Sequence, residues 1–264
     1  MISQIWEIVK KDFFLSLTYR FNFFFQFFAW GFNLLLWFFL SKIIPEKSFN
    51  STSGYFPFVL SGIALQSLFN TLLYGNSSRI REHMLMGNLE FILNNLKKPY
   101  IFLISGLVYD FINSFIRIFF ILIGANFLFS FPLKNFNPFL FFISLLLSSI
   151  SFSALGNFSS SFVLVYKKGE PFSYFFTMFS AFFGGVYFPI SLFPPILQKI
   201  SYLTPMAQGL ILFRASFFKS QNTSTIYFSL LYFILFIIIF YSFSIYLFSK
   251  AFWYAKRKGT ISTY

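Results

Sequence analysis

The chain contains no cysteine, one histidine and seven acidic residues among its 264. Without cysteine, disulfide bonds, thiolate metal sites and a thiol nucleophile are excluded. The single histidine, His83, stands in REHMLMG without a second metal-ligand side chain beside it, and we expect it to be ordinary surface. No GxxxxGK(S/T) motif and no HExxH motif occurs, so we expect neither a P-loop nucleotide site nor a zinc-protease site.

Charged residues make up only 10% of the chain, whereas hydrophobic residues make up 57% and the mean hydropathy is +0.72. A soluble domain could not bury so much apolar surface, so the composition predicts an all-α, multi-pass membrane protein. Phenylalanine alone accounts for 49 residues, an excess that indicates the codon bias of an AT-rich genome rather than an aromatic binding site. The net charge of +13 predicts contact with anionic membrane lipid and not with nucleic acid. The N-terminal MISQIWEIVKKDFF predicts no signal peptide.

Carboxylates are too few for the enzymes that work inside membranes. An intramembrane aspartyl protease needs two aspartates that share a proton. The chain has Asp110 in a predicted span, but its other aspartate, Asp12, lies in a predicted interfacial helix. Serines are abundant in a later span, which contains no histidine or lysine base to activate one. We therefore predict that the chain is not itself an enzyme and binds no metal or cofactor.

Apolar runs predict six transmembrane helices in one domain that covers residues 1–264. Residues 1–20 place Trp6 and Val9 on one helical face and lysines off it, which is typical of a helix lying in the membrane interface. The fourth apolar run is rich in serine, alanine and glycine, and such small residues let helices pack closely. The predicted spans are Phe21–Ile44, Pro57–Tyr74, Tyr100–Phe131, Phe139–Tyr166, Phe172–Ile190 and Ile226–Phe248.

The longest polar segment, residues 76–99, follows the second predicted span. Apolar residues recur at helical spacing within it, and Gly87-Asn88 interrupts their pattern. We predict two short helices joined at a hinge at Gly87, with Asn88 as a candidate N-cap and Glu90 in the first turn of the second helix. The pattern alone leaves two interpretations open, a solvated surface or a contact with a partner.

Polar side chains within the predicted spans are few. Asn22, Gln26 and Asn33 are separated by four and seven residues, which places them on one helical face. Such a stripe should face protein or water, either between packed helices or along a translocation path. Asp110 and Arg117 also share one face, about 10 Å apart along the axis. We expect a long-range ion pair or bonds to neighbouring helices, or else a polar path; in that last case Arg117→Ala would impair transport more than assembly.

Lysine and arginine residues set the predicted orientation. If both termini are cytoplasmic, thirteen of the twenty basic residues lie in cytoplasmic segments and six lie outside. The segment 184–218 then faces out, where we predict a fifth span that breaks near the membrane surface, followed by short re-entrant or interfacial helices. The residues at these breaks are Gly184, Gly185, Pro189, Pro194, Pro195 and Pro205.

Two stretches resemble the permeases of ABC-2 type exporters, and the order and spacing of their motifs agree over essentially the whole chain. Asn88 and Lys97-Lys98 depart from the family's usual small or apolar residues. In MGNLEFILNNLKKPYIFLISGLVYD the matching residues are Gly87, Leu89, Glu90, Leu93 and Pro99. In GGVYFPISLFPPILQKISYLTPMAQGLILFR they are Gly185, Phe188, Pro189, Pro194, Pro195, Leu197, Pro205 and Arg214.

The resemblance implies a half-transporter that pairs with a second copy or close relative and with two copies of an ABC ATPase. ATP and magnesium would bind to the ATPase and not to this chain. In this family the loop after the second span holds a coupling helix that docks on the ATPase. That role would fall to residues 76–99, with Arg81, Glu82, Gly87, Leu89 and Glu90 as the candidate coupling residues.

Export across the plasma membrane of a prokaryote is the expected activity. The cargo would be amphipathic or lipid-linked, such as a drug, a glycolipid or a polysaccharide. The alternative is a secondary transporter or channel that works without an ATPase. That alternative predicts inverted repeats and paired polar residues on broken helices at mid-membrane, and neither is evident in the sequence.

Overall fold

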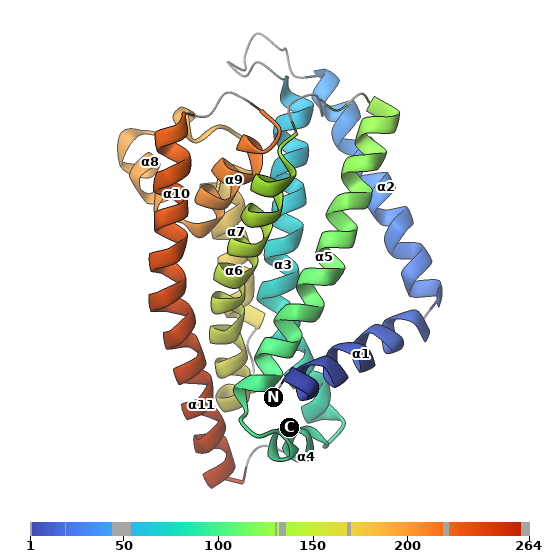
Figure 1. Ribbon diagram of the computed structural model, residues 1–264, viewed down its shortest axis with the longest axis vertical. Coiled ribbons are helices and arrows are strands. Elements are labelled where there is room, and N and C mark those ends of the chain that lie inside the picture. The colour runs from blue at the N-terminus through green and yellow to red at the C-terminus, as the bar shows by residue number, and fades with distance from the viewer. Residues whose placement is uncertain are drawn as a thin grey trace.

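Helices make up every regular element of residues 2–18, 20–43, 54–129, 131, 136–167, 170–218 and 222–259, the part of the chain that the computed structural model describes (Figure 1). In chain order they are α1 (Ile2–Thr18), α2 (Arg20–Ile43), α3 (Tyr55–Leu85), α4 (Leu89–Asn95), α5 (Tyr100–Phe129), α6 (Pro138–Tyr166), α7 (Glu170–Phe183), η2 (Ile190–Leu192), α8 (Pro195–Tyr202), α9 (Pro205–Ala215), α10 (Thr223–Phe236), η3 (Ile237–Tyr241) and α11 (Ser242–Arg257). The short helices α4 and α8 lie at opposite ends of the bundle, which we name the α4 end and the α8 end (Figure 1).

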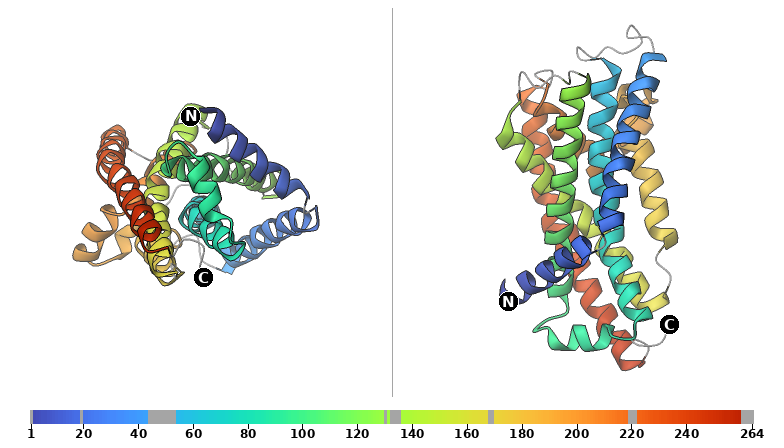
Figure 2. Two further views of the ribbon diagram at one scale, coloured as in Figure 1. Left: turned by 90° about the horizontal axis from the view of Figure 1, so that it is seen from below. Right: turned by 90° about the vertical axis from the view of Figure 1, so that its right-hand side faces the viewer.

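Four helices in the described residues are long and apolar enough to cross a membrane. They are α3, α5, α6 and the continuous helix Thr223–Arg257, and they run along the long axis of the molecule (Figures 1 and 2). The all-α membrane architecture is therefore confirmed, but length and composition support four spans and not six. The first predicted span corresponds to α2, whose apolar stretch is shorter, Phe28–Ile43. The fifth corresponds to α7, which has 14 residues and ends before Gly184, so that it is about 21 Å long against a hydrocarbon core of about 30 Å.

The central helix is α3, which packs mainly against α6. A glycine in α6 permits this close approach, because a Cβ added at Gly156 would overlap the carbonyl oxygen of Leu72. The serines that precede and follow Gly156 on α6, such as Ser151 and Ser159, are fully buried. The run of small residues in α6 therefore lets α3 and α6 pack closely, as the sequence predicts.

The helix α3 also extends further than the sequence pattern predicts. It continues without a break through Asn76 to Leu85, so the first of the two predicted short helices is the end of a long one. Ile80 and Met84 are almost completely buried and continue the core-facing side of α3 at helical spacing. The polar segment 76–99 therefore contains the end of α3, a turn and α4.

Prolines begin the short helices at the α8 end. Pro195 and Pro205 each occupy a first-turn position of α8 and α9, where the missing N–H has no intrahelical partner to lose. The hydroxyl of Thr204 caps α9 by accepting a hydrogen bond from the Ala207 N–H at 3.2 Å. The prolines predicted to break the chain thus also start new helices.

The last long helix contains one π turn, η3, between α10 and α11. Before this turn, Ser229 donates a hydrogen bond to Gln208 of α9 at 2.7 Å. After it, Ser244 accepts one from Asn157 of α6 at 3.4 Å. A π turn widens the helix locally and changes which face follows. One helix therefore presents polar side chains to two different neighbours.

The first helix, α1, lies across the bundle near the α4 end instead of along it (Figures 1 and 2). It packs on α5, with Val9 buried, while the Trp6 side chain is 60% exposed. An apolar face that is only partly covered by protein is what an interfacial helix requires.

Candidate functional site

The turn between α3 and α4, which we call the tip, lies at the α4 end, where α11 also ends (Figure 1). Gly87 has a φ of 68°, a left-handed conformation that glycine adopts without strain, and open space surrounds the position of a Cβ there. Asn88 precedes α4 but makes no side-chain capping bond; its Oδ1 lies 2.9 Å from Nδ1 of His83 instead. Glu90 falls in the first turn of α4.

The tip has one buried face and one exposed face. Leu89 and Leu93 of α4 are buried against α3, α5, α6 and α11. On the opposite face, Leu85, Met86 and Phe91 are 62%, 61% and 72% exposed. We call these three side chains the apolar tip. They lie at the end of α3, in the turn and on α4, and α4 is packed against the bundle through Leu89 and Leu93. Exposed apolar side chains gathered in one short segment are typical of a surface that a partner covers.

The predicted coupling residues divide between these two faces. Glu82 and Gly87 are exposed, and Arg81 and Glu90 are partly buried. Leu89 is 0% exposed, so it holds α4 against the bundle and does not reach the surface. Sequence reasoning missed the apolar tip. The apolar stripe expected from Leu85 through Leu89, Ile92 and Leu96 put Leu85 on the buried face, whereas it is exposed. Phe91 could have been noticed as an apolar residue that lies off this stripe.

Two other elements bond to the short helix α4. Gln4 of α1 donates to the carbonyl oxygen of Asn95 at 3.4 Å. Lys256 of α11 donates to Oδ1 of Asn94 at 2.7 Å. The N-terminal and the last helices of the bundle thus both contact the segment that carries the apolar tip.

Above the tip, a cluster of polar and charged side chains lies within the bundle. Arg79 of α3 forms a bidentate ion pair with Asp110 of α5, in which one guanidinium nitrogen lies 3.1 Å from Oδ2 and the other contacts Oδ1. The Nε of Arg79 also lies 3.5 Å from a carboxylate oxygen of Asp12 in α1. Side-chain exposure is only 17% for Arg79 and 5% for Asp110. A buried pair of this kind holds its helices together, because breaking it leaves an uncompensated charge.

Asn76 extends this cluster to α6 and α11. It accepts a hydrogen bond from Arg79 at 3.2 Å and donates to the Leu103 carbonyl oxygen and to Asn157, each at 3.2 Å. Asn157 in turn donates to Ser244 of α11 at 3.4 Å. Together, α1, α3, α5, α6 and α11 are joined by one network. We call Asp12, Asn76, Arg79, Asp110 and Asn157 the charge cluster.

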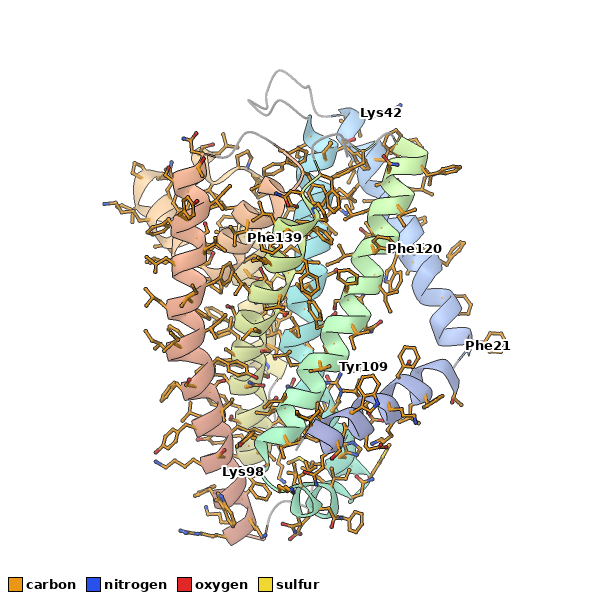
Figure 3. All side chains as sticks on the ribbon, viewed as in Figure 1. Phe21, Lys42, Lys98, Tyr109, Phe120 and Phe139 are labelled. Atoms are coloured by element: carbon orange, nitrogen blue, oxygen red, sulfur yellow. The ribbon has the colours of Figure 1, made fainter. Side chains whose placement is uncertain are left out.

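Two glycines provide the space for the charge cluster. A Cβ at Gly75 would overlap the carboxylate of Asp110, and a Cβ at Gly106 would overlap the Asn76 amide and lie 2.6 Å from Arg79. Tyr109 covers the guanidinium of Arg79 at 5.1 Å, where α1 crosses α5 (Figure 3). Glycine in the middle of a helix costs about 1 kcal/mol relative to alanine, and here that cost permits the ion pair to form.

Arg117 and Asp110 do not pair with each other. Asp110 is occupied by Arg79, while Arg117 donates to the hydroxyl of Thr71 at 3.2 Å and lies 5.1 Å from the ring centre of Trp30 in α2. Each charge therefore bonds to a neighbouring helix, which was one of the three arrangements expected. Of the predicted polar stripe on α2, Asn33 is exposed, whereas the side chains of Asn22 and Gln26 lie outside the described residues.

At the α8 end, Arg214 of α9 is partly buried. The sequence matched it to a family motif but did not predict it as a site residue. It donates to the hydroxyl of Ser61 at 3.1 Å and to the carbonyl oxygens of Phe58 at 3.1 Å and Gly185 at 3.0 Å. Its guanidinium lies 3.7 Å from the ring centre of Phe58. Gly185, with a φ of 73°, turns the chain after α7 and presents this carbonyl. Through these hydrogen bonds, Arg214 holds the broken-helix segment 184–218 against α3.

The remaining predicted break residues lie along this segment. Gly184 is buried against the Met206 side chain, and Pro189 precedes η2. Pro194 precedes α8. A pocket of about 470 Å³ lies beside the segment, lined by Trp37, Leu40, Ile43, Tyr55, Tyr187 and Phe188.

One comparison with known families identifies the chain. A family model described as ABC-2 family transporter protein matches residues 37–246. The matched region includes the turn at Gly87, the Arg79–Asp110 pair and the segment around Arg214. No curated protein sequence matches the chain.

Proposed function

The chain belongs to the ABC-2 family of transporter proteins, and on that basis we propose that it is the membrane-spanning permease subunit of an ATP-driven exporter. Two copies of a separate ABC ATPase would bind ATP and magnesium and supply the energy. A second copy of this chain, or a close relative, would complete the transport path. The cargo would be an amphipathic or lipid-linked molecule, moved out across the plasma membrane of a prokaryote.

Six spans would follow if α2 and α7 also cross the membrane. The 24 residues of α2 are about 36 Å long, which suffices. The shorter α7 would need the turn at Gly185, η2 and α8 to complete its crossing. Irregular backbone of this kind is stable at membrane depth only where protein or water surrounds it, and Arg214 supplies one of the required hydrogen bonds, to the carbonyl oxygen of Gly185.

The distribution of basic residues supports a cytoplasmic α4 end. Lys98 lies at the α4 end and Lys42 at the other (Figure 3). Positive side chains favour the cytoplasmic side of membrane proteins, and both α1 and the end of α11 lie at the α4 end (Figure 1). Among the described residues, the exposed basic side chains of α11 and of the other segments at the α4 end are Lys10, Lys11, Lys97, Lys98, Lys250, Lys256, Arg257 and Lys258, against Lys42 and Lys199 in segments near the α8 end.

The apolar tip is the observation that carries the proposal. A transporter without its own nucleotide site must receive its energy through a contact, and Leu85, Met86 and Phe91 form an exposed apolar surface on a well-anchored segment. ATP binding in the partner would displace the tip, and α3 and α5 would carry that displacement into the bundle. Glu82, Glu90 and Arg81 would surround the contact and contribute mainly to its specificity.

The experiment is to co-purify the chain with an ABC ATPase, a gene for which we expect beside its own, and to measure ATP hydrolysis in the reconstituted complex. Phe91→Ser should weaken binding of the ATPase about tenfold or more, because the loss of one buried aromatic anchor typically costs 1–2 kcal/mol or more. Tyr254→Ser is a matched control, since Tyr254 is an exposed aromatic residue of α11 at the same end, and it should leave binding unchanged.

Two outcomes would contradict the proposal. Transport by the purified chain without nucleotide or ATPase would favour the secondary transporter or channel. Unchanged ATPase stimulation after both Phe91→Ser and reversal of the charges at Arg81, Glu82 and Glu90 would place the docking site elsewhere.

A further inference from the structure

Three arginines lie within the bundle, and they differ in how their hydrogen-bonding needs are met. A guanidinium has five N–H donors and no acceptor. Arg79 contacts two carboxylates and an amide oxygen. Arg214 donates to one hydroxyl and two carbonyl oxygens. Arg117 makes a single hydrogen bond within the described residues, to Thr71, and its buried Nε has no partner there.

Arg117 is also the arginine placed deepest along its helix. It is the eighteenth residue of α5, which begins at Tyr100, and so lies about 26 Å from that end at about 1.5 Å per residue. A charge at such a depth in a membrane is costly unless it is paired or hydrogen bonded. The carboxylate on the same helix face, Asp110, is already bound to Arg79. Structural stability alone therefore does not explain why the guanidinium of Arg117 lies at this depth with most of its hydrogen-bond donors unpaired within the described residues.

The surroundings of Arg117 suit an anionic group attached to an apolar body. The guanidinium lies beside Trp30 of α2, which in turn contacts Phe120 of α5 at 6.1 Å between ring centres. Phe120 is 43% exposed, and Phe28 on α2 is 67% exposed. Arg117 itself is only partly buried. An apolar chain could thus lie against these aromatic side chains while its charged group reaches the guanidinium.

Trp30 precedes Asn33 by three residues, so the two residues share one side of α2. Guanidinium is the side-chain group whose fork of donors matches a phosphate or a carboxylate in two parallel hydrogen bonds. A ligand of that kind would supply the acceptors that the protein leaves out.

We propose that Arg117 binds the negatively charged group of the cargo, and that the cargo is an amphiphile carrying a phosphate or a carboxylate. The proposal rests on the transport function proposed above but is tested without it. Neutral and cationic amphiphiles would be poor ligands of this site, because they leave the guanidinium as unsatisfied as it is now.

The test is equilibrium binding of dodecyl phosphate to the full chain in phosphatidylcholine nanodiscs, with empty discs as the blank and no ATPase present. Dodecyltrimethylammonium and dodecanol have the same chain length with positive and no charge. The wild-type chain should prefer dodecyl phosphate to both, and Arg117→Gln should bind it about tenfold or more weakly, as expected for the loss of charge-assisted hydrogen bonds.

Two further variants separate anion binding from a structural role. Lys42→Gln removes one exposed positive charge at the α8 end and should leave binding unchanged. Thr71→Val removes the one hydrogen bond of Arg117 but keeps its charge, and should retain binding within a few fold. If Thr71→Val loses binding as fully as Arg117→Gln, the arginine is only a tie between α3 and α5 and the proposal is wrong.

The wild-type chain gives a test that does not depend on any variant folding. Equal binding of dodecyl phosphate and dodecyltrimethylammonium would overturn the proposal, as would wild-type affinity in Arg117→Gln. Adding phosphatidylglycerol to the discs then identifies the source of the anionic group. Competition would assign the site to a membrane lipid and its absence would assign it to a separate cargo; both results uphold anion binding at Arg117.

Discussion

The two ends of the bundle are each fastened by a buried arginine, but with different chemistry. At the α4 end, Arg79 is paired with Asp110 and approaches Asp12, and the network continues through Asn76 to two further helices. At the α8 end, Arg214 is held by a hydroxyl and two carbonyl oxygens. The first arrangement joins side chains of several helices, whereas the second joins one helix to the backbone of two segments.

This difference determines how each end responds to a perturbation. Removing one member of a buried ion pair leaves the other charge without a partner, a large penalty. Removing Arg214 takes away the charge itself and leaves only neutral acceptors. The α4 end is therefore expected to be the more sensitive of the two to single substitutions, although it lies nearest to the surface that would meet the ATPase.

The largest effect is expected for Asp110→Asn. The substitution keeps the shape of the side chain but leaves Arg79 with only one ion pair, to Asp12 at 3.5 Å. It should destabilise the chain by about 3 kcal/mol, the lower end of the range for a broken buried ion pair. Thermal unfolding in a neutral detergent measures the effect. The double variant with Arg79→Met should recover part of the loss, and if it is less stable than Asp110→Asn alone, the ion pair is not what stabilises this end.

A smaller effect is expected at the other end, for Arg214→Met. Three hydrogen bonds are lost, but a buried charge is lost with them, so the net cost should be about 2 kcal/mol. The same unfolding measurement compares the two ends directly. If Arg214→Met lowers the free energy of unfolding as much as Asp110→Asn or more, an arginine held by carboxylates is no more sensitive to substitution than one held by neutral acceptors, and the comparison fails.

The smallest effect is expected for Gly106→Ala, which tests whether the charge cluster needs its space. Overpacking costs typically 1–3 kcal/mol, offset by about 1 kcal/mol of improved helix propensity, so a net loss of about 1 kcal/mol is expected. Gly124→Ala is the matched control on the same helix, because its new Cβ would meet only the Leu34 side chain at 3.7 Å. That control should be neutral or slightly stabilising; equal results for the two glycines would show that the cluster is not tightly confined.

Composition and periodicity were sufficient to predict an all-α membrane protein and a turn at Gly87, and the resemblance of two stretches to known permeases predicted the ABC-2 family. They could not predict the length of α3, because Ile80 and Met84 continue its buried face through a segment whose polar residues suggested a loop. Helical spacing tells which face a residue occupies but not which helix lies opposite. The pairing of Arg79 with Asp110, 31 residues away, was therefore not readable from the pattern.

The hydrogen bonds of Arg214 could not be predicted from the sequence pattern either. Its acceptors at Phe58 and Ser61 lie more than 150 residues earlier in the chain, and its own sequence surroundings predicted an outer segment in which a basic residue is unremarkable. The glycines within the helices could have indicated where the charge cluster lies. A glycine inside a helix indicates a close approach, and Gly75 and Gly106 both border the charge cluster.

The unbroken course of α3 has a mechanical consequence. Arg79 lies about 9 Å from the end of α3 at Leu85 and about 36 Å from its start at Tyr55. A stiff rod held at that point is a lever whose arms differ about fourfold. A rotation that displaces the apolar tip by about 1 Å would displace the other end of α3, where Tyr55 lines the pocket, by about 4 Å in the opposite direction. The place of the charge cluster along α3 would thus set how far the pocket moves for a given push at the tip.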